Sequence, residues 1–231
     1  MNNDSGITAV ATRLVDLSHA IEHGMTTYPG LPAPAISTHL SRKGSRGSYA
    51  SGVEFHIGRI EMVANTGTYL DSPFHRYADG ADLADLPLDV LADLPAIVAR
   101  AETDVQSAIG PEVFGQAEVN GAAVLVDTGW SRHWGTETYR SGNPYLTEEA
   151  ARALVDGGAL LVGIDSLNID STEDPSRPAH SILLDAGIPI VENLTGLEAL
   201  PERGLRFFAV PAKVRGLGSF PVRAFALVLE E

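Results

Sequence analysis

One segment of the chain, residues 65–75 (NTGTYLDSPFH), combines side chains whose types and spacing could carry out chemistry. Asp71 and His75 lie four positions apart, close enough to share one site, and Pro73 marks a turn between them. A carboxylate can bind a metal, and a His side chain, with an unperturbed pKa of roughly 6.5, can move a proton near neutral pH. The structural alternative is that Asp71 is only the N-cap of a helix that has Pro73 in its first turn.

A second pair of polar residues, His180 and Glu192, lies far along the chain. Glu192 ends the apolar run 188–191, and burying a lone carboxylate costs several kcal/mol unless it is paired or bound to a metal. His180 follows a proline-rich segment, 175–179, and precedes an apolar stretch. On the sequence alone, a structural role such as a salt bridge is the simpler interpretation of both residues.

Size and charge limit the classes of protein to which the chain can belong. Its 231 residues fit one large domain or two small ones, and 44% hydrophobic residues are enough for a substantial core. The net charge is −14, from 30 acidic and 16 basic residues. This balance disfavours nucleic acid and anionic membrane surfaces as partners, because phosphate binding needs clustered Lys and Arg.

The absence of cysteine and the hydropathy of the chain exclude further classes. Without cysteine there can be no disulfide, cysteine metal ligand or cysteine nucleophile. Residues 1–11 are polar and do not resemble a signal peptide. No run approaches the roughly 20 apolar residues of a membrane span. We therefore expect a soluble cytoplasmic protein.

Short apolar runs separated by turn residues predict the strands. Continuous apolarity indicates strands that are covered on both faces of a sheet. These runs are residues 95–99, 122–126, 159–164, 188–191 and 224–229. Residues 57–63 alternate between apolar and polar side chains and predict a half-exposed strand.

Helices are fewer than strands. The clearest spans residues 148–155, with Thr147 as its N-cap, two Glu in its first turn and Gly157 as its stop. Shorter candidates are residues 83–91, 112–114 and 181–186.

Two irregular segments complete the pattern. Residues 175–179 are expected to form a loop, which leads into a helix that Gly187 ends. Residues 41–52, rich in Gly, Ser and basic side chains, predict a mobile loop. The chain shows no internal repeat or linker, so strands and helices together indicate one compact α/β domain with a mixed sheet.

The segment 65–75 resembles the H-x-G-T-H-x-D-x-P-x-H signature of the cyclase family, which includes bacterial kynurenine formamidase and isatin hydrolase. Other blocks match the family in order along nearly the full length: residues 16–19, 24–25, 28–30, 127–131, 163–166 and 221–224. The resemblance implies a single domain over residues 1–231, of the family's swivelling β/β/α type, with a mixed β-sheet or barrel flanked by helices. It also implies a homodimer or a homotetramer.

The resemblance assigns roles to the polar residues. Asp71 would be a metal-ligating carboxylate and His75 the side chain that moves a proton beside it. His180 and Glu192 would complete the site. In binuclear members, such a pair binds a second metal together with the shared Asp.

Asn65 and Tyr69 stand where the family's signature has two metal-ligating His. Both are poorer partners for zinc than neutral imidazole, although a Tyr hydroxyl can donate a proton or bind a substrate carbonyl. Two interpretations stay open. In one, Asp71, His180 and Glu192 hold a single divalent ion, zinc or manganese. In the other, no metal binds because two ligands are replaced, and the remaining residues form an organic acid–base site.

A substrate pocket is also implied. In the family, a turn like that of Tyr28, Pro29 and Gly30 lines the pocket. Trp130 follows the end of a predicted strand, where pockets tend to open, so Trp130 and Asn65 are further candidates for contact with substrate.

Three hypotheses of function follow. The leading one is a hydrolase that opens an amide, lactam or lactone of a small aromatic substrate with a metal-activated water. In the second, a metal-independent cyclase, dehydratase or isomerase of a biosynthetic pathway uses Tyr69 and His75 as acid and base. The third is a non-catalytic binding scaffold. Serine-hydrolase, P-loop and zinc-protease motifs are absent from the sequence.

Overall fold

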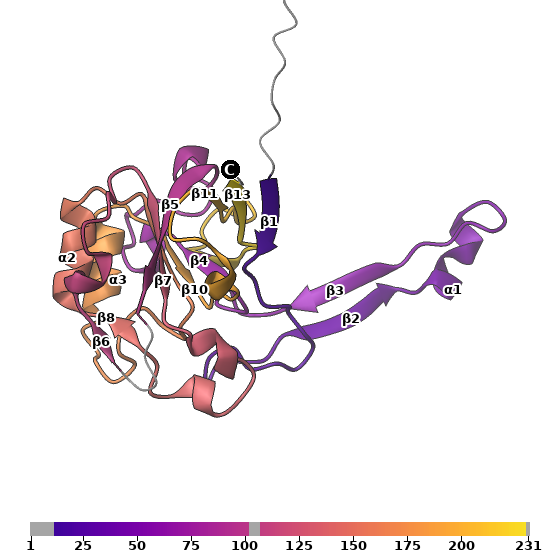
Figure 1. Ribbon diagram of the computed structural model, residues 1–231. Helices are drawn as coiled ribbons and strands as arrows, with labels where there is room; N and C mark the ends of the chain where they lie inside the picture. Colours follow the sequence, from indigo (N-terminus) through magenta and orange to yellow (C-terminus); the bar gives the residue numbers. More distant parts are fainter. Residues whose placement is uncertain (1–11, 102–106, 230–231) are drawn as a thin grey trace, which may run out of the picture.

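A computed structural model describes residues 12–101 and 107–229 (Figure 1). The body is built on one nine-stranded sheet, from which a two-stranded arm projects. In the order in which they pair, the strands of the sheet are β1 (Thr12–Asp16), β13 (Phe225–Leu229), β11 (Leu205–Phe208), β5 (Leu94–Arg100), β7 (Ala123–Asp127), β9 (Leu161–Ile164), β10 (Ile190–Glu192), β4 (Tyr69–Asp71) and β12 (Ser219–Pro221). The four strands from β5 to β10 pair in parallel, and the others pair antiparallel, so the sheet is mixed.

The sheet curls into a half-barrel because strands near its two ends are joined by a short connection. Strand β12 forms one edge and β13 lies next to the other edge, yet only residues 222–224 separate them. On this connection, the Val222 N–H donates to the Thr68 carbonyl, and the Leu17 N–H donates to the Ala224 carbonyl, both at 2.9 Å. The right-handed twist of strands accommodates such closure. The expected fold class, an α/β domain with a curled mixed sheet, is confirmed.

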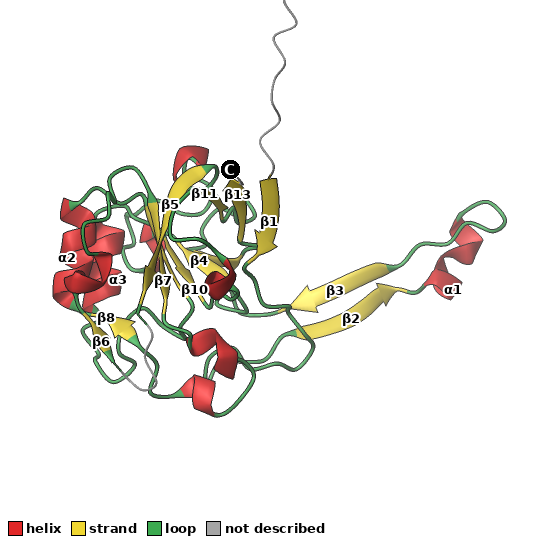
Figure 2. Cartoon of the chain, viewed as in Figure 1, coloured by secondary structure: helices red, strands yellow, loops and turns green. Residues whose placement is uncertain are grey.

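Helices α2 (Glu148–Asp156) and α3 (Pro178–Asp185) pack side by side and cover one face of the sheet (Figure 2). Along β7, Val124 and Val126 pack into the core beneath these helices, whereas Ala123 and Leu125 face the interior of the curl. This alternation follows from the two-residue period of a strand. All five continuous apolar runs form strands, and β7 is covered on both faces as the sequence predicts.

The two helices begin in different ways. In α2 the Thr147 hydroxyl accepts the Ala150 N–H at 3.2 Å, and the helix ends at Gly157, as predicted. Helix α3 begins at Pro178, three residues before the predicted start. The reason is a distant cap: the Asp170 carboxylate accepts the N–H groups of residues 179 and 180 at 2.7 and 3.1 Å.

Of the other two predicted helices, the one over residues 83–91 is wrong, and the one over residues 112–114 is only a 3₁₀ turn. Residues 83–91 contain only the short 3₁₀ turn η3 (Leu88–Val90), because Pro87 interrupts the segment and Asp82 caps the preceding turn with its side chain. Residues 112–114 lie in a 3₁₀ turn, η4 (Pro111–Phe114). The remaining short elements of the body are η2 (Pro73–His75), β6 (Ala108–Ile109), η5 (Trp130–His133), η6 (Thr138–Arg140), β8 (Tyr145–Leu146) and η7 (Leu197–Ala199).

The arm consists of β2 (Ala35–Leu40) and β3 (Ile57–Glu61), with the short helices α1 (Arg42–Ser45) and η1 (Arg46–Ser48) at its tip. The expected loop 41–52 therefore contains helical turns. The Ser41 hydroxyl caps α1 by accepting the Gly44 N–H at 3.1 Å. Strand β3 differs from the expected half-exposed strand, because every one of its residues is exposed.

Two expectations concern the cellular context of the chain. Within the part of the chain that the structure describes, no helix is both long and apolar enough to span a membrane. The polar segment 1–11 lies outside the described residues. The prediction of one domain over residues 1–231 extends to these outlying residues and stays a prediction there.

The interior of the curl generates a stability prediction. Leu125 is fully buried, and its Cδ2 packs so close to Gly163 that a Cβ there would lie 2.9 Å away. We expect Leu125→Ala to lower the free energy of unfolding by about 2–5 kcal/mol, because it leaves a cavity that the sheet cannot close. Urea unfolding measures this change. The matched control, Leu88→Ala, truncates a side chain that is 66% exposed and should change stability by less than about 0.5 kcal/mol; equal losses in both would contradict the prediction.

Candidate active site

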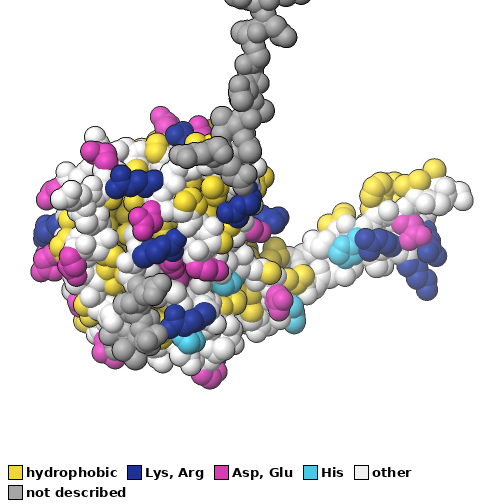
Figure 3. Space-filling view, viewed as in Figure 1, with side chains coloured by type: hydrophobic (Ala, Val, Ile, Leu, Met, Phe, Trp, Pro, Cys, Tyr) yellow, Lys and Arg dark blue, Asp and Glu magenta, His cyan; other side chains and the backbone are white. Residues whose placement is uncertain are grey.

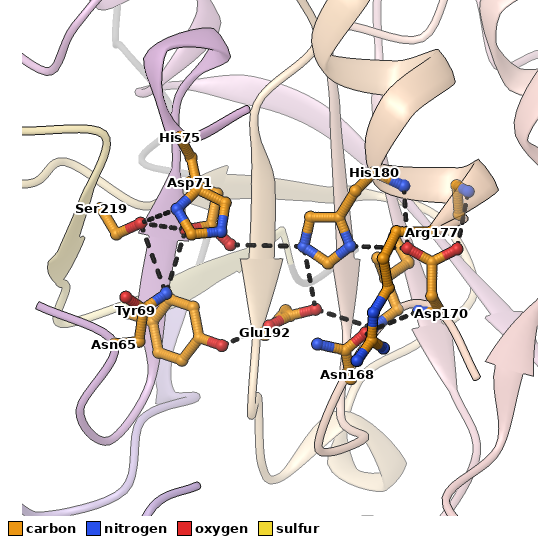
Figure 4. A network of polar contacts seen from close by, with 12 residues as sticks. Asn65, Tyr69, Asp71, His75, Asn168, Asp170, Arg177, His180, Glu192 and Ser219 are labelled. Carbon is orange, nitrogen blue, oxygen red and sulfur yellow. Dashed lines mark hydrogen bonds and ion pairs between the residues drawn. The ribbon is translucent and has the colours of Figure 1, made fainter. Parts of the chain in front are cut away.

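Three short strands, β10, β4 and β12, bring the polar residues together (Figure 4). Their antiparallel register places Tyr69 opposite Glu192 and Asp71 opposite Ser219. Tyr69 and Asp71 are two positions apart on one strand, so their side chains point to the same face of the sheet. All four side chains are at least nine-tenths buried, and the Tyr69 hydroxyl donates a hydrogen bond to Glu192 Oε2.

The turn that follows β4 returns His75 toward the same face. Asp71 closes the strand and Ser72 precedes the 3₁₀ turn η2, so Asp71 is not the helix cap of the structural alternative. His75 Nδ1 lies 2.8 Å from Ser219 Oγ and 3.6 Å from Asp71 Oδ1. The His75 side chain is 37% exposed, so it links the buried carboxylate to the solvent-accessible side of the site.

Ser219 decides which His75 nitrogen is free. A hydroxyl has one hydrogen, and Ser219 donates it to Asp71 Oδ1. The contact with His75 then requires Nδ1–H to donate to Ser219 Oγ. In the neutral imidazole, this leaves Nε2 with its lone pair and makes it the basic nitrogen. The two hydrogen bonds that connect Asp71, Ser219 and His75 therefore orient a general base.

His180 reaches the site from the first turn of α3. Its Nδ1 is held by Asp170 Oδ2 at 2.7 Å, and its Nε2 lies 3.7 Å from Asp71 Oδ2 and 3.5 Å from Glu192 Oε1. Burial opposes a positive charge on His180. The negative charge of Glu192 and the contacts with Asp170 and Asp71 outweigh it, so the pKa of His180 is raised.

Glu192 and Tyr69, which face each other across β10 and β4, also have shifted pKa values. Burial raises the pKa of Glu192, and the charge of Asp71 adds to this, while His180 works against it. The pKa of Tyr69 is raised well above its usual value by burial, then by the charges of Glu192 and Asp71. Tyr69 therefore keeps its proton and remains a hydrogen-bond donor.

The side chains fit one divalent ion. Asp71 Oδ2 is buried and has no hydrogen-bond partner among the described residues, which is costly unless a cation or a proton lies beside it. Ligand atoms of Asp71, His75 and His180 lie within 4.8 Å of one another. Glu192 Oε1, the other predicted ligand, lies 3.5 Å from His180 Nε2. Two atoms that each lie about 2.1 Å from a tetrahedral ion are about 3.4 Å apart, so the distances of 3.7 and 3.5 Å from His180 Nε2 to Asp71 Oδ2 and Glu192 Oε1 are each compatible with a shared ion. Glu192 is not a member of the group of three that lies within 4.8 Å.

The other side of the two carboxylates is occupied by protein donors. Asn65 Nδ2 lies 3.4 Å from Asp71 Oδ1, which also accepts from Ser219, and Tyr69 donates to Glu192 Oε2. The residues that replace two His of the family signature thus satisfy the carboxylate oxygens by hydrogen bonds. Asp170 holds His180 through Nδ1 and leaves Nε2 free, as the outer partners of metal-binding His do.

The site opens into a cavity of about 360 Å³. Its lining residues are Tyr28, Leu31, Asn65, Tyr69, His75, Arg76, Asn168, Pro175, Ser176, Arg177, His180 and Glu192. Of the residues that were expected to contact substrate, Tyr28 and Asn65 are in this set. Pro29 and Gly30 are not, although they lie between the lining residues Tyr28 and Leu31 in the sequence.

Trp130 is placed differently from the expectation. Its side chain is 3% exposed and packs with Tyr139 and Leu167 in a separate aromatic cluster. The indole N–H donates to the Tyr139 carbonyl at 3.3 Å. The left-handed turn at Gly129 (φ 68°) precedes Trp130, which packs in this cluster and is not among the residues that line the cavity.

Further residues of this region were not predicted from the sequence, among them Ser219, Asp170, Arg76 and Arg177. No motif marks Ser219 and Asp170, because strand pairing and helix capping alone bring them to the site. Arg177 has a backbone signal that only a structure reveals. Its φ is +47°, a left-handed conformation that is strained for a residue other than Gly and is common at functional sites.

Comparison with known proteins identifies the family. The model of the family described as "Putative cyclase" matches residues 15–171. The chain belongs to the cyclase family. Cyclase-family relatives match over almost their entire length: kynurenine formamidase from Bacillus cytotoxicus is 29% identical over 93% of this chain and 97% of that protein.

Solved structures agree with this assignment. Isatin hydrolase A from Labrenzia aggregata, described as bound to benzyl benzoate, superposes with a TM-score of 0.80 at 23% identity, over 95% of this chain and 94% of that one. A protein described as a potential metal-dependent hydrolase with cyclase activity gives 0.77 at 26% identity, over 96% and 100%. At this level of description the chain is a cyclase-family hydrolase, with arylformamidase-like relatives.

The position of His75 generates a prediction. A Cβ added to Gly218 would lie 2.4 Å from the His75 backbone nitrogen and 2.5 Å from its Cα, so Gly218→Ala must displace His75 or Ser219. We expect a loss of about 1–3 kcal/mol in the free energy of unfolding. We also expect a shifted imidazole signal of His75 in NMR spectra, assigned by its loss in His75→Gln.

Gly47→Ala is the matched control, because its added Cβ would meet open space and its φ is not positive. It should leave both measurements unchanged. A His75 signal that stays in place in Gly218→Ala would show that the close approach does not position this side chain.

Proposed function

We propose that the chain hydrolyses an amide, lactam or lactone of a small aromatic substrate, with one divalent ion held by Asp71, His180 and Glu192. The observation that carries the proposal is the convergence of Asp71 Oδ2 and Glu192 Oε1 on His180 Nε2, beside His75 and at the wall of a cavity. When bound, such an ion polarises a carbonyl and lowers the pKa of water toward roughly 7. Carboxylate and imidazole ligands are compatible with zinc or manganese.

The residues of the chain supply the proton transfers. His75 accepts a proton at Nε2 from the water that attacks the substrate carbonyl. It then gives this proton to the leaving nitrogen or oxygen as the bond to the carbonyl carbon breaks. Ser219 and Asp71 hold the imidazole in the tautomer that this step needs. Tyr69 stays protonated and fixes the orientation of Glu192 by its hydrogen bond.

Two arginines in the cavity wall favour a substrate that carries an anionic group. Arg76 and Arg177 both line the cavity, and neither has a carboxylate within 4.0 Å among the described residues, although the chain has 30 acidic residues. Arg177 is held in place: its guanidinium donates to Ser171 O at 2.9 Å and to Asn168 Oδ1 at 3.2 Å. The charge of Arg177 also acts on the Asp174 carboxylate, which lies beyond ion-pair distance. A fixed guanidinium with no carboxylate in direct contact is suited to bind one on a ligand.

A metal-independent cyclase, dehydratase or isomerase remains the second candidate. It is favoured by the raised pKa of His180, because a protonated His180 could hold Asp71 and Glu192 together without an ion. In this case His75 would remain the base. Tyr69 is a poor acid here, since its pKa is raised by burial and by two carboxylates.

Metal content separates the two candidates. We expect about one zinc or manganese ion per chain by elemental analysis of protein purified without a chelator or a metal-affinity column. Asp71→Asn and His180→Gln should each lose most of it, because each removes a ligand. His39→Gln, which changes an exposed His on β2, is the matched control and should retain it. Protein that holds no metal after dialysis against zinc and manganese would rule out the hydrolase mechanism and leave the second candidate.

Substrate charge gives a second prediction. Among formanilides, lactams and lactones offered in pairs that differ only by a ring carboxylate, the carboxylate member should have the higher kcat/KM. Arg177→Gln should reduce this preference by about 10–100-fold, which is the loss of one charge-assisted hydrogen bond. Arg215→Gln changes an exposed Arg that is not among the lining residues and should leave the preference intact. A wild-type preference for the neutral members would contradict the assignment of Arg177.

A further inference from the structure

The pairing of β4 with β10 stops at the site itself. Glu192 and Tyr69 are the last pair of residues in the register, and both strands have their boundary there. Acidic side chains are scattered over the surface of the body (Figure 3), whereas Glu192 is fully buried on this last pair. The ends of paired strands open more readily than their middles. The hydrogen bond from Tyr69 to Glu192 therefore depends on contacts beyond the paired strands.

Asn193, the residue directly after Glu192, makes such contacts. Its backbone is left-handed (φ 57°), a conformation in which Asn is several-fold enriched among residues other than Gly. The Asn193 side chain reaches the segment that precedes β4, where its Nδ2 donates to the Gly67 carbonyl at 3.0 Å. In return, the Thr68 hydroxyl donates to the Asn193 carbonyl at 2.5 Å. Two side-chain hydrogen bonds thus join the two segments where the pairing of the strands has stopped.

The Asn193 amide can be oriented in only one way. The Gly67 carbonyl only accepts hydrogen bonds, so it requires Nδ2 on its side. This places Oδ1 toward Tyr139, whose hydroxyl donates to it at 2.7 Å. Burial, then the charges of Asp165 and Glu192, raises the pKa of Tyr139 well above its usual value, so the hydroxyl keeps its proton. The buried Asn193 amide is therefore satisfied at both ends, which fixes its orientation.

The same contacts hold the segment that leads into β4. The Gly67 N–H donates to the Thr27 hydroxyl at 2.9 Å, and Thr27 is buried and precedes Tyr28, a residue of the cavity wall. Asn193 and Thr27 thus hold Gly67 by its carbonyl and by its N–H. Gly67 is itself left-handed (φ 67°), and Tyr69 begins β4 two residues later. The Asn193 amide therefore acts on Tyr69 through Gly67, as it acts through the chain on the residue before it.

We propose that Asn193 is a positioning residue of the active site. Its amide holds β4 and β10 together beyond their last pair, so that Tyr69 stays in contact with Glu192 Oε2 while Oε1 stays near His180 Nε2. Neither Asn193 nor Tyr139 is among the residues that line the cavity, so both act without touching a ligand there. The effect on catalysis rests on the proposed function, because it is exerted through Glu192; the effect on the position of Tyr69 does not.

Fluorine NMR of protein labelled with 3-fluorotyrosine tests the position of Tyr69 without a substrate. The chain has six tyrosines, and the Tyr69 signal is assigned by its loss in Tyr69→Phe. Asn193→Gly removes the amide and keeps a residue type that tolerates the left-handed backbone. We expect the Tyr69 signal to move or broaden in this variant, because the hydroxyl is no longer held against Glu192.

Val228→Ala is the matched control. It truncates a buried side chain on β13, so it lowers stability through the core and leaves the contacts of Asn193 in place. The Tyr69 signal should stay where it is. Tyr139→Phe removes only the donor to Asn193 Oδ1, should shift the Tyr69 signal less, and decides the question if Asn193→Gly does not fold. A Tyr69 signal that stays in place in both Asn193→Gly and Tyr139→Phe would overturn the proposal.

A double-mutant cycle measures the effect on catalysis, with the formanilide that the wild type hydrolyses fastest. Asn193→Gly should lower kcat by about 10–100-fold and change KM less, because a misplaced site group slows the reaction although Asn193 does not touch the substrate. In a Tyr69→Phe background the same change should cost kcat much less, since the contact that Asn193 positions is already lost. Equal factors in the two backgrounds would show that Asn193 acts on stability alone and would overturn its positioning role.

Failure of the proposed function has a different outcome. A chain that hydrolyses none of the amides, lactams and lactones would contradict the proposed function. The fluorine spectra would still decide whether Asn193 holds Tyr69 in place: a displaced Tyr69 signal in Asn193→Gly, together with an unmoved one in Val228→Ala, would support it.

Discussion

The pairing of β4 between β10 and β12 is the constraint on which the site depends. It sets two buried carboxylates, Asp71 and Glu192, side by side on a sheet face, which would cost several kcal/mol if they were left without partners. The protein offsets this cost on two sides. Asn65, Tyr69 and Ser219 donate hydrogen bonds to one oxygen of each carboxylate, and the other oxygens converge on His180.

The curl of the sheet and the placement of the helices follow from the same arrangement. Closure through residues 222–224 keeps β12 beside β4 and thereby delivers Ser219 to Asp71. On the same face of the sheet as the site, the Asp170 carboxylate caps α3 and also binds Nδ1 of the His180 ring. A single side chain therefore fixes both where the helix starts and which nitrogen of His180 faces the site.

Much of the fold could be predicted from the sequence, because it depends on local patterns. Continuous apolar runs predict the central strands, and Thr147 predicts the start of α2, since both signals act within a few residues. The start of α3 could not be predicted, because its cap is a side chain eight residues upstream of the helix. The segment 83–91 has a helix-like pattern. Pro87 interrupts it, and the Asp82 side chain caps the turn before it, so no helix forms. At the site, the signature residues were predicted, whereas Ser219 and Asp170 became visible only through pairing and capping. Trp130 packs in an aromatic cluster and is not among the residues that line the cavity, because a residue after a strand end can turn inward as readily as outward.

The short link between β12 and β13 has a consequence for how the protein responds to its ligands. The groups at the site come from segments separated by as many as 154 residues, and they meet only when the half-barrel has closed. No fragment of the chain can therefore hold a partial site in working geometry. Since a ligand binds only the closed form, its binding stabilises the whole sheet against opening. Occupancy of a cavity at one edge of the sheet should thus protect amide hydrogens at the opposite edge, in β1 and β13, from exchange with solvent.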